Sequence, residues 1–244
     1  MLDVARKFFT MDYLKQYVKI LSFYKMNEFQ IHLNDNGFPQ FFGDDWNRTY
    51  AAFRLESERF PGLTAKDGSY SKQEFIDLQR MGLEYGVRII PEIDIPAHSL
   101  AFAHYKPEIA SRKYGMDHLD LYKKETYQFV DSLLDEYLSG DNPVFIGDLH
   151  IGTDEYNKKE AEQYRYFTDR YLKFVEKYGK NVRMWGGLKW LPGKTPVKAE
   201  GVTVNAWSYD WVDPVVSLQD GYKLINTCDT YLYIVPVSYT HLRA

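Results

Sequence analysis

Two adjacent carboxylic acids, Asp154 and Glu155, follow an apolar segment that ends at Ile151. Consecutive carboxylates at the mouth of a buried strand repel each other, so each makes the other harder to ionise. A carboxyl group that keeps its proton can act as a general acid, and later as a base. The sequence therefore predicts acid–base chemistry at this pair.

Neighbouring residues on a regular strand point to opposite faces, so both carboxylates could reach one ligand only where the strand breaks down. Gly152 lies just upstream of the pair, and a helix-forming run begins at about Lys158. Glycine inside a strand pattern marks a bend or a close backbone approach. We therefore expect the strand to end between Gly152 and Glu155.

Further polar and aromatic residues recur at the C-terminal ends of the other predicted strands. They are Asp3, His32, Asn34, Asp35, Glu92, Asp94, His98, His150, Trp185, Trp207 and Tyr231. Buried polar groups are costly unless they pair with one another or bind a ligand. For Asp3, Glu92 and Asp94, a structural hydrogen-bond network and a functional role both remain open.

Short apolar runs alternate with longer amphipathic segments along the chain, and these are the strands and helices that would position the polar residues. This alternation predicts an α/β fold, a (β/α)₈ barrel in a single domain. The predicted strands are Met1 to Val4, Phe29 to Leu33, Val87 to Ile93, Val144 to Ile151, Val182 to Trp185, Val202 to Trp207 and Lys223 to Thr227.

Capping residues mark the predicted helices. Thr10 is placed to cap the first helix, and Ser71 with Glu74 forms a capping box for a helix that ends before Gly86. Two later helices are predicted at about 124–138 and 158–178, the second ending at Gly179. Residues 36–70 are expected to be a long loop, and loops after barrel strands carry function.

Composition narrows the functional classes. The net charge is -4 and the pI is about 5.9, which argues against nucleic acid as a partner. No apolar run approaches the roughly 20 residues that a membrane span needs. A single cysteine, Cys228, excludes an internal disulfide. Aromatic residues make up 17% of the chain, which is compatible either with sugar binding or with core packing.

The segment HIGTDEY at residues 150–156 resembles the signature of glycoside hydrolase family 20, the β-N-acetylhexosaminidases and lacto-N-biosidases. The resemblance covers roughly residues 1–236, as an incomplete catalytic barrel that lacks its last βα unit and a substrate-binding arginine before the first strand. The tail, 237–244, resembles nothing in the family. The other matching segments are MLDVARKFF, YKMNEFQIHLNDN, VRIIPEIDIPAHS, WGGLKW, VNAW and INTCDTYLY.

The resemblance implies a role for each matching residue. Glu155 would be the general acid and base, and Asp154 would orient the 2-acetamido group of the substrate, whose carbonyl oxygen attacks C1 to form an oxazolinium. His98 and Asp35 would support the acid/base. Trp185, Trp207 and Tyr231 would surround the sugar, with Tyr233 as the second choice for the tyrosine, and Asp3 and His150 complete the predicted substrate-binding set. No metal or organic cofactor is implied.

The implied substrate is an oligosaccharide or glycoconjugate with a terminal β-linked GlcNAc or GalNAc, and the family resemblance suggests secretion or cell-surface location. Three alternatives stay open at this point. The chain could be a lacto-N-biosidase that releases a disaccharide, an inactive carbohydrate-binding fragment, or a barrel hydrolase with an ordinary two-carboxylate mechanism.

Overall fold

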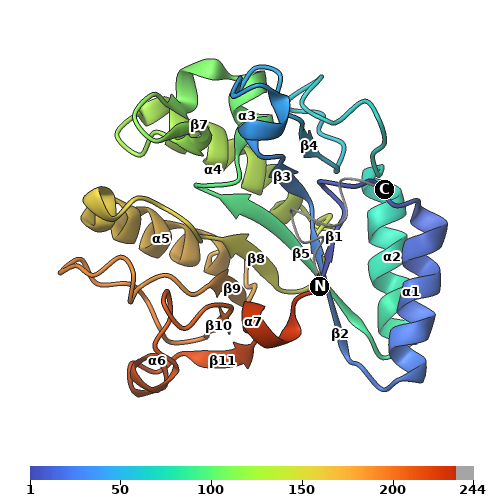
Figure 1. Ribbon diagram of the computed structural model, residues 1–244. Coiled ribbons are helices and arrows are strands. Elements are labelled where there is room, and N and C mark those ends of the chain that lie inside the picture. Colours follow the sequence, from blue (N-terminus) through green and yellow to red (C-terminus); the bar gives the residue numbers. More distant parts are fainter. Residues whose placement is uncertain (235–244) are drawn as a thin grey trace.

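The structure, a computed structural model, describes residues 1–234, and a curled sheet of parallel strands forms its centre (Figure 1). The spatial order of the strands follows their order in the chain, so each connection crosses back over the sheet before the next strand begins. The strands are β1 (Leu2–Asp3), β2 (Glu28–His32), β5 (Arg88–Ile95), β8 (Leu149–Gly152), β9 (Val182–Trp185), β10 (Val202–Ala206) and β11 (Lys223–Asn226).

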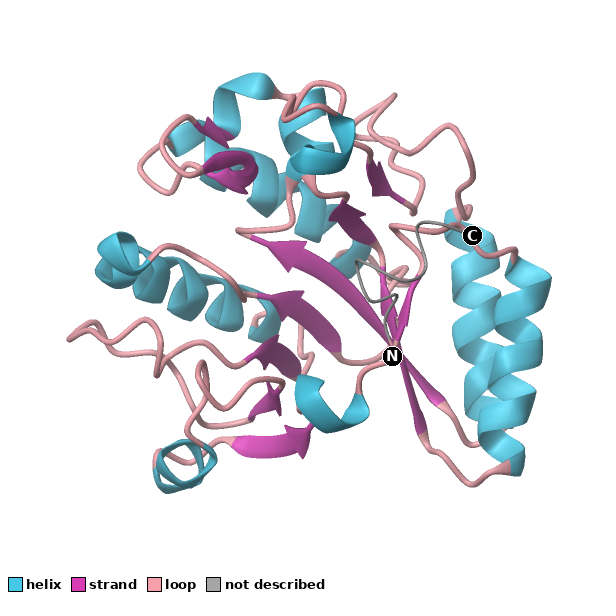
Figure 2. Cartoon of the chain, viewed as in Figure 1, coloured by secondary structure: helices cyan, strands magenta, loops and turns pink. Residues whose placement is uncertain are grey.

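The helices are α1 (Met11–Phe23), α2 (Lys72–Glu84), α3 (Leu100–Tyr105), α4 (Lys124–Leu138), α5 (Ala161–Glu176), α6 (Pro214–Gln219) and α7 (Asp229–Leu232). Among them, α1, α2, α5 and α6 contact strands of the curled sheet, and α1 and α2 pack side by side (Figure 2). Single 3₁₀ turns cover Pro39–Phe42, Pro107–Ile109 and Lys158–Glu160. Because helices cover one face and side chains fill the other, the central strands β5 and β8 are almost entirely buried.

The helix ends follow the local chemistry that the sequence predicts. The side chain of Thr10 accepts a hydrogen bond from the backbone of Tyr13, and Ser71 with Glu74 forms the capping box of α2. Gly86 and Gly179 have left-handed backbones with φ of 70° and 71°. The α5 helix begins later than predicted, because the turn Lys158–Glu160 precedes it.

Two small antiparallel hairpins extend beyond the C-terminal ends of the main strands. The strands β3 (Asn34–Asn36) and β4 (Ala51–Phe53) form the first hairpin, within the region that the sequence predicts as loop. The strands β6 (Ala110–Ser111) and β7 (Gly115–Leu119) form the second hairpin, between β5 and β8 in the chain, and no sequence pattern predicted it. Both hairpins therefore belong to the end of the sheet where the predicted functional residues lie.

The fourth main strand is shorter than predicted. The sequence predicts a strand from Val144 to Ile151, but β8 begins at Leu149. The buried side chain of Gln79 donates to the carbonyl oxygen of Val144 at 2.7 Å and accepts from the amide of Ile146 at 2.9 Å. A side-chain amide thus satisfies backbone groups that a neighbouring strand would otherwise pair.

The sheet agrees with the predicted barrel in strand direction and order, as a partial barrel of seven parallel strands. In the part of the chain that the structure describes, β1 and β11 each pair with one main-sheet neighbour and form its two edges. The predicted domain boundary after residue 236 and the tail at 237–244 lie outside the described residues. None of the helices described is both long and apolar enough to pass through a membrane.

Gly152 lies at the end of β8, at a position where the chain is tightly packed. Its φ is 70°, and a Cβ atom built there would lie 1.8 Å from Oδ1 of Asp94. Gly179 has nearly the same φ, 71°, but nothing within 4 Å of the added atom. We predict that Gly152→Ala lowers the free energy of unfolding by about 3 kcal/mol or more, and Gly179→Ala by about 1 kcal/mol. Urea denaturation measures both, and equal losses would contradict the close packing.

Candidate active site

The backbone leaves strand geometry immediately after β8. Gly152, Thr153 and Glu155 all have left-handed φ values, 70°, 73° and 48°. Such values are rare for residues other than glycine, and they cluster at functional sites where the surrounding structure fixes them. The predicted break in the strand is therefore confirmed, and it removes the alternation that would send the next two side chains to opposite faces.

Asp154 and Glu155 consequently approach the same histidine. Nε2 of His98 lies 3.3 Å from Oε2 of Glu155 and 3.7 Å from Oδ2 of Asp154. The side chain of Asp154 is largely buried, whereas that of Glu155 is 49% exposed. Asp154 thus faces the protein interior at the end of the sheet, and Glu155 borders solvent. The imidazole of His98 lies near both.

Asp35 contacts the other ring nitrogen of His98, the one that faces away from Asp154 and Glu155. Its Oδ1 lies 2.9 Å from Nδ1 of His98, and its Oδ2 accepts contacts from His32 Nε2 at 2.6 Å and Arg6 Nη1 at 2.7 Å. Burial raises the pKa of Asp35, but the charges of these partners outweigh burial and hold the pKa well below its usual range. Asp35 is therefore an ionised anchor between three cationic groups.

The two adjacent carboxyl groups have opposite pKa shifts. Burial, assisted by the charge of Glu155, raises the pKa of Asp154 to about 6. The close contact of its Oε2 with Nε2 of His98 lowers the pKa of Glu155, against the effect of its partial burial. The sequence predicted that mutual repulsion would raise both pKa values. This is correct for Asp154 and wrong for Glu155, because the His98 cation compensates the charge of Glu155.

The pKa of His98 itself follows from its neighbours. Burial disfavours the imidazolium, but the charges of Asp35 and Asp154 outweigh burial and raise the pKa well above its usual range. His98 is therefore an imidazolium beside an ionised Glu155. Both of its ring nitrogens carry a proton, and Nδ1 faces Asp35 while Nε2 faces the paired carboxylates.

A third carboxyl group, Asp94, lies behind the pair at the end of β5. It is 1% exposed, its Oδ1 has no hydrogen-bond partner among the described residues, and it approaches the backbone of Gly152 closely. Burial and the charge of Asp154 raise the pKa of Asp94 well above its usual range. Side-chain atoms of Asp94, His98 and Asp154 lie within 4.8 Å of one another. The positive charge in this group is the imidazolium of His98 itself, which lies beside both carboxyl groups.

Deeper in the sheet, Glu92 continues the network. It accepts a hydrogen bond from Trp185 Nε1 at 2.6 Å and one from Gln30 Nε2 at 2.8 Å, and Nδ1 of His32 lies 3.0 Å away. Burial opposes the ionisation of Glu92. The charge of His32, together with the hydrogen bonds that Glu92 accepts, outweighs burial and lowers the pKa of Glu92 to about 2. His32 therefore bridges two buried carboxylates, Glu92 and Asp35. These contacts agree with the structural network, one of the two alternatives that the sequence left open for Glu92.

His150 is fully buried and supports the interior of the sheet end. Its ring packs on Trp185 with centroids 4.9 Å apart, and its Nδ1 accepts the amide of Gly152 at 3.1 Å. Burial lowers the pKa of His150 to about 4, so the ring is neutral near pH 7. In this state His150 holds the turn that carries Asp154 and Glu155.

The comparison with known proteins identifies the family. The sequence model described as "Glycosyl hydrolase family 20, catalytic domain" matches residues 1–165. The chain belongs to glycosyl hydrolase family 20. The "Beta-hexosaminidase" of Porphyromonas gingivalis is 25% identical over 85% of this chain and 29% of its own length. The "Beta-hexosaminidase" of Akkermansia muciniphila is 27% identical over 85% of this chain and 46% of its own length.

Solved structures agree with the family 20 assignment. A mutant Streptomyces plicatus β-hexosaminidase in complex with its product GlcNAc superposes with a TM-score of 0.72, at 25% identity. The match covers 92% of this chain and 46% of that one. The chain thus spans less than half the length of each of these relatives.

Three further residues were predicted for the family 20 site, and the structure gives their surroundings. Asp3 is partly exposed and pairs with Arg6 at 3.0 Å. Trp207 is 8% exposed, donates to the carbonyl oxygen of Gly186 at 2.8 Å and packs on Trp211. Tyr231 lies on α7 and is 78% exposed.

Tyr233 is the second choice from sequence for the tyrosine that contacts the sugar. It lies directly after α7 and is 37% exposed, about half as much as Tyr231. Burial raises the pKa of Tyr233, and the charges of Asp154 and Glu92 raise it further. Which of the two tyrosines contacts the sugar stays a prediction.

Arg6 and His32 are site residues to which the sequence assigned no role. Arg6 joins Asp3 to Asp35, and its position just after the first strand was the available signal. His32 was noted only as one polar residue at the end of a strand.

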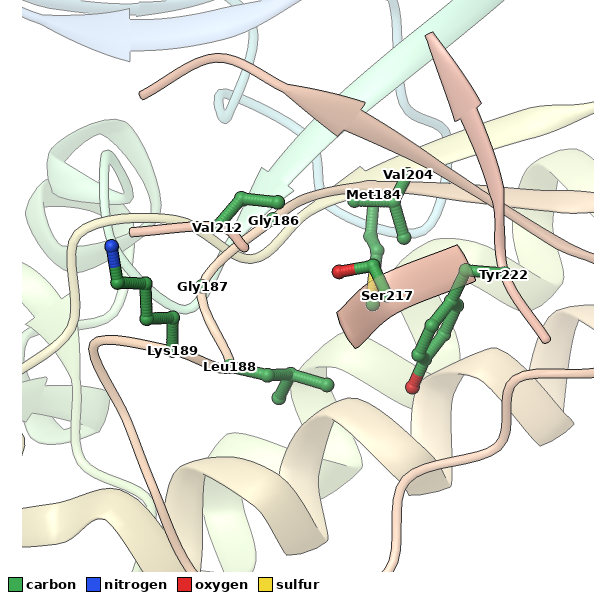
Figure 3. A pocket seen from close by; sticks show the side chains of 9 residues that line it. All are labelled: Met184, Gly186, Gly187, Leu188, Lys189, Val204, Val212, Ser217 and Tyr222. Carbon is green, nitrogen blue, oxygen red and sulfur yellow. The ribbon is translucent and has the colours of Figure 1, made fainter. Parts of the chain in front are cut away.

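A small cavity of about 20 Å³ lies elsewhere, between β9, β10 and α6 (Figure 3). Its lining residues include neither of the paired carboxylates, so it is not the catalytic centre.

The raised pKa of Asp154 has a consequence for stability. The fold disfavours the ionised form of Asp154. Its protonated carboxyl group therefore contributes fully to stability below pH 3.8, the pKa in the unfolded chain, and this contribution is lost as the pH rises through about 6, the pKa in the folded chain. We predict that Asp154→Asn increases the free energy of unfolding at pH 7.5, on the order of 2 kcal/mol, and changes it little at pH 4. Denaturant titration at the two pH values measures this. Asp141→Asn, at an exposed position, is the control, and a loss of stability in Asp154→Asn at pH 7.5 would contradict the pKa shift.

Proposed function

We propose that this chain carries the catalytic centre of a retaining exo-glycosidase that removes a terminal β-linked N-acetylhexosamine from an oligosaccharide or glycoconjugate. The observation that carries the proposal is the approach of two adjacent carboxyl groups to one histidine, at 3.3 Å and 3.7 Å. Family membership, relatives named β-hexosaminidase and the complex of the Streptomyces plicatus enzyme with GlcNAc support the substrate class.

In the proposed first step, Glu155 protonates the glycosidic oxygen while the bond from that oxygen to C1 breaks. The carbonyl oxygen of the substrate's 2-acetamido group forms a new bond to C1, which gives an oxazolinium. Asp154 holds the acetamido nitrogen and stabilises the positive charge that develops there. That charge favours ionised Asp154, whose pKa of about 6 in the free protein lies just below neutral pH.

Glu155 needs a proton for this step, and the free protein holds that proton on His98. A sugar bound over the half-exposed Glu155 would exclude water and raise its pKa, so that the proton moves from Nε2 of His98 to the carboxylate. Asp35 stays ionised and keeps the ring oriented during the transfer. The histidine and Asp35 thus assist the change in protonation without contacting the reacting bond.

In the second step, Glu155 accepts a proton from water as the water oxygen attacks C1 and the bond to the acetamido oxygen breaks. Two displacements at C1 give net retention of configuration, and no covalent bond forms between the sugar and the protein. This distinguishes the proposal from an ordinary two-carboxylate glycosidase, in which a sugar ester of an enzyme carboxylate can be trapped.

The proposal predicts that the purified protein hydrolyses a 4-nitrophenyl N-acetyl-β-glucosaminide at least about 10³-fold faster than the matching glucoside with a plain 2-hydroxyl, because only the former carries the nucleophile. Glu155→Gln should lower hydrolysis of an alkyl N-acetylglucosaminide by about 10²- to 10⁴-fold, with less effect on the nitrophenyl substrate, whose leaving group needs little protonation. Steady-state kinetics on the three substrates measure both effects.

The exposed Glu125 on α4 provides a matched control, since Glu125→Gln removes the same charge far from the paired carboxylates in sequence. Equal turnover of the acetamido and hydroxyl substrates would rule out substrate assistance. Binding of the sugar without turnover would indicate a carbohydrate-binding fragment, and release of a disaccharide would indicate a lacto-N-biosidase.

A further inference from the structure

A second histidine contacts Glu155, at its backbone instead of its side chain. Nε2 of His118, on β7, lies 3.2 Å from the carbonyl oxygen of Glu155. A carbonyl oxygen can only accept, so the imidazole must donate. On its other side, Nδ1 of His118 lies 2.8 Å from Oδ1 of Asp117. A carboxylate also only accepts, so the ring that makes both contacts donates from both nitrogens, and the two contacts together fix its orientation.

The contact extends to the next residue of the catalytic segment. The rings of His118 and Tyr156 pack with centroids 5.4 Å apart, and the hydroxyl of Tyr156 donates to the carbonyl oxygen of Leu119 at 2.7 Å. Two successive residues of β7 thus hold two successive residues of the segment that follows β8. Because Tyr156 is buried, this attachment is shielded from water.

The same strand also holds the loop that carries His98. The amide of Ser99 donates to the carbonyl oxygen of Asp117 at 2.8 Å, and the amide of Leu119 donates to the carbonyl oxygen of Pro96 at 2.7 Å. His98 lies between these two attachments and has a left-handed φ of 51°. The strand β7 therefore bridges the His98 loop and the Glu155 turn, the two segments whose side chains form the acid/base contact.

Glu155 needs such a support. Its φ of 48° is disfavoured, and its side chain is half exposed, so few side-chain contacts fix its position. A residue in a disfavoured conformation persists only where the surroundings determine it. The contact with His118 acts directly on the backbone of that residue.

We propose that His118, oriented by Asp117, is a positioning residue that holds Glu155 at its working distance from His98. The inference rests on the proposed function for its kinetic consequences, whereas its structural part concerns only the backbone of residues 153–157. It gives the β6–β7 hairpin a task in the reaction, although neither of its strands supplies a residue that contacts the paired carboxylate groups.

Three variants test the proposal. His118→Phe keeps a ring against Tyr156 and removes the donor, whereas His118→Gln keeps an N–H group that can reach the carbonyl oxygen. His104→Phe is the matched control, because Nε2 of His104 also contacts a backbone carbonyl oxygen, that of Trp46 at 2.9 Å, without contacting Glu155. Thermal denaturation establishes that each variant is folded before the other measurements.

Hydrogen exchange by mass spectrometry tests the structural part without reference to activity. We expect peptides that span residues 150–160 to exchange roughly 10-fold faster in His118→Phe than in the wild type, with partial recovery in His118→Gln and no change in His104→Phe. Unchanged exchange in His118→Phe would overturn the proposal, whether or not the protein is an active glycosidase.

Kinetics test the functional part. Misplacing an acid/base by a fraction of an ångström lowers kcat, so His118→Phe should reduce kcat on an alkyl N-acetylglucosaminide by roughly 10- to 100-fold with KM nearly unchanged. The loss on a nitrophenyl substrate should be smaller, and His118→Gln should restore part of the rate. A wild type without activity would refute the proposed function alone, whereas equal kcat in wild type and His118→Phe would refute the positioning role.

Discussion

Charge balance is the constraint on which this site depends. Five carboxyl groups gather at the C-terminal end of the sheet, where burial opposes their ionisation; they are Asp35, Glu92, Asp94, Asp154 and Glu155. His32, His98 and Arg6 compensate only part of this charge. Asp35, Glu92 and Glu155 are in close contact with these cations and stay ionised, whereas burial raises the pKa of Asp94 well above its usual range and that of Asp154 to about 6.

The uneven compensation gives two neighbouring residues different roles. Glu155 contacts the imidazolium of His98 and borders solvent, so its protonation can change when a ligand displaces water. Asp154 is buried next to Asp94 and has a pKa of about 6, so a positive charge in the bound ligand favours its ionised form. Such differences between neighbouring acids mark acid–base sites in general. Here they arise from the positions of one histidine and one glycine-led turn.

The sequence predicted the strand order, the helix caps and the centre of the site, because these follow from local patterns. Parallel strands bring their C-terminal ends to one edge, so the sequence pattern alone predicts that Asp35, His98, Asp154 and Glu155 lie together. The residues that were missed depend on contacts between distant segments. His118 lies on a hairpin that has no sequence signal, and Gln79 replaces a strand partner for residues 144–146.

A crystal structure of the protein with a thiazoline mimic of the oxazolinium would show whether the two adjacent carboxyl groups have the proposed separate roles. We expect the carboxylate of Asp154 to accept a hydrogen bond from the ring nitrogen of the mimic, while Glu155 lies on the leaving-group side of C1 and stays in contact with His98. Binding with Asp154 turned away from this nitrogen, or with Glu155 and His98 separated, would refute the proposed roles.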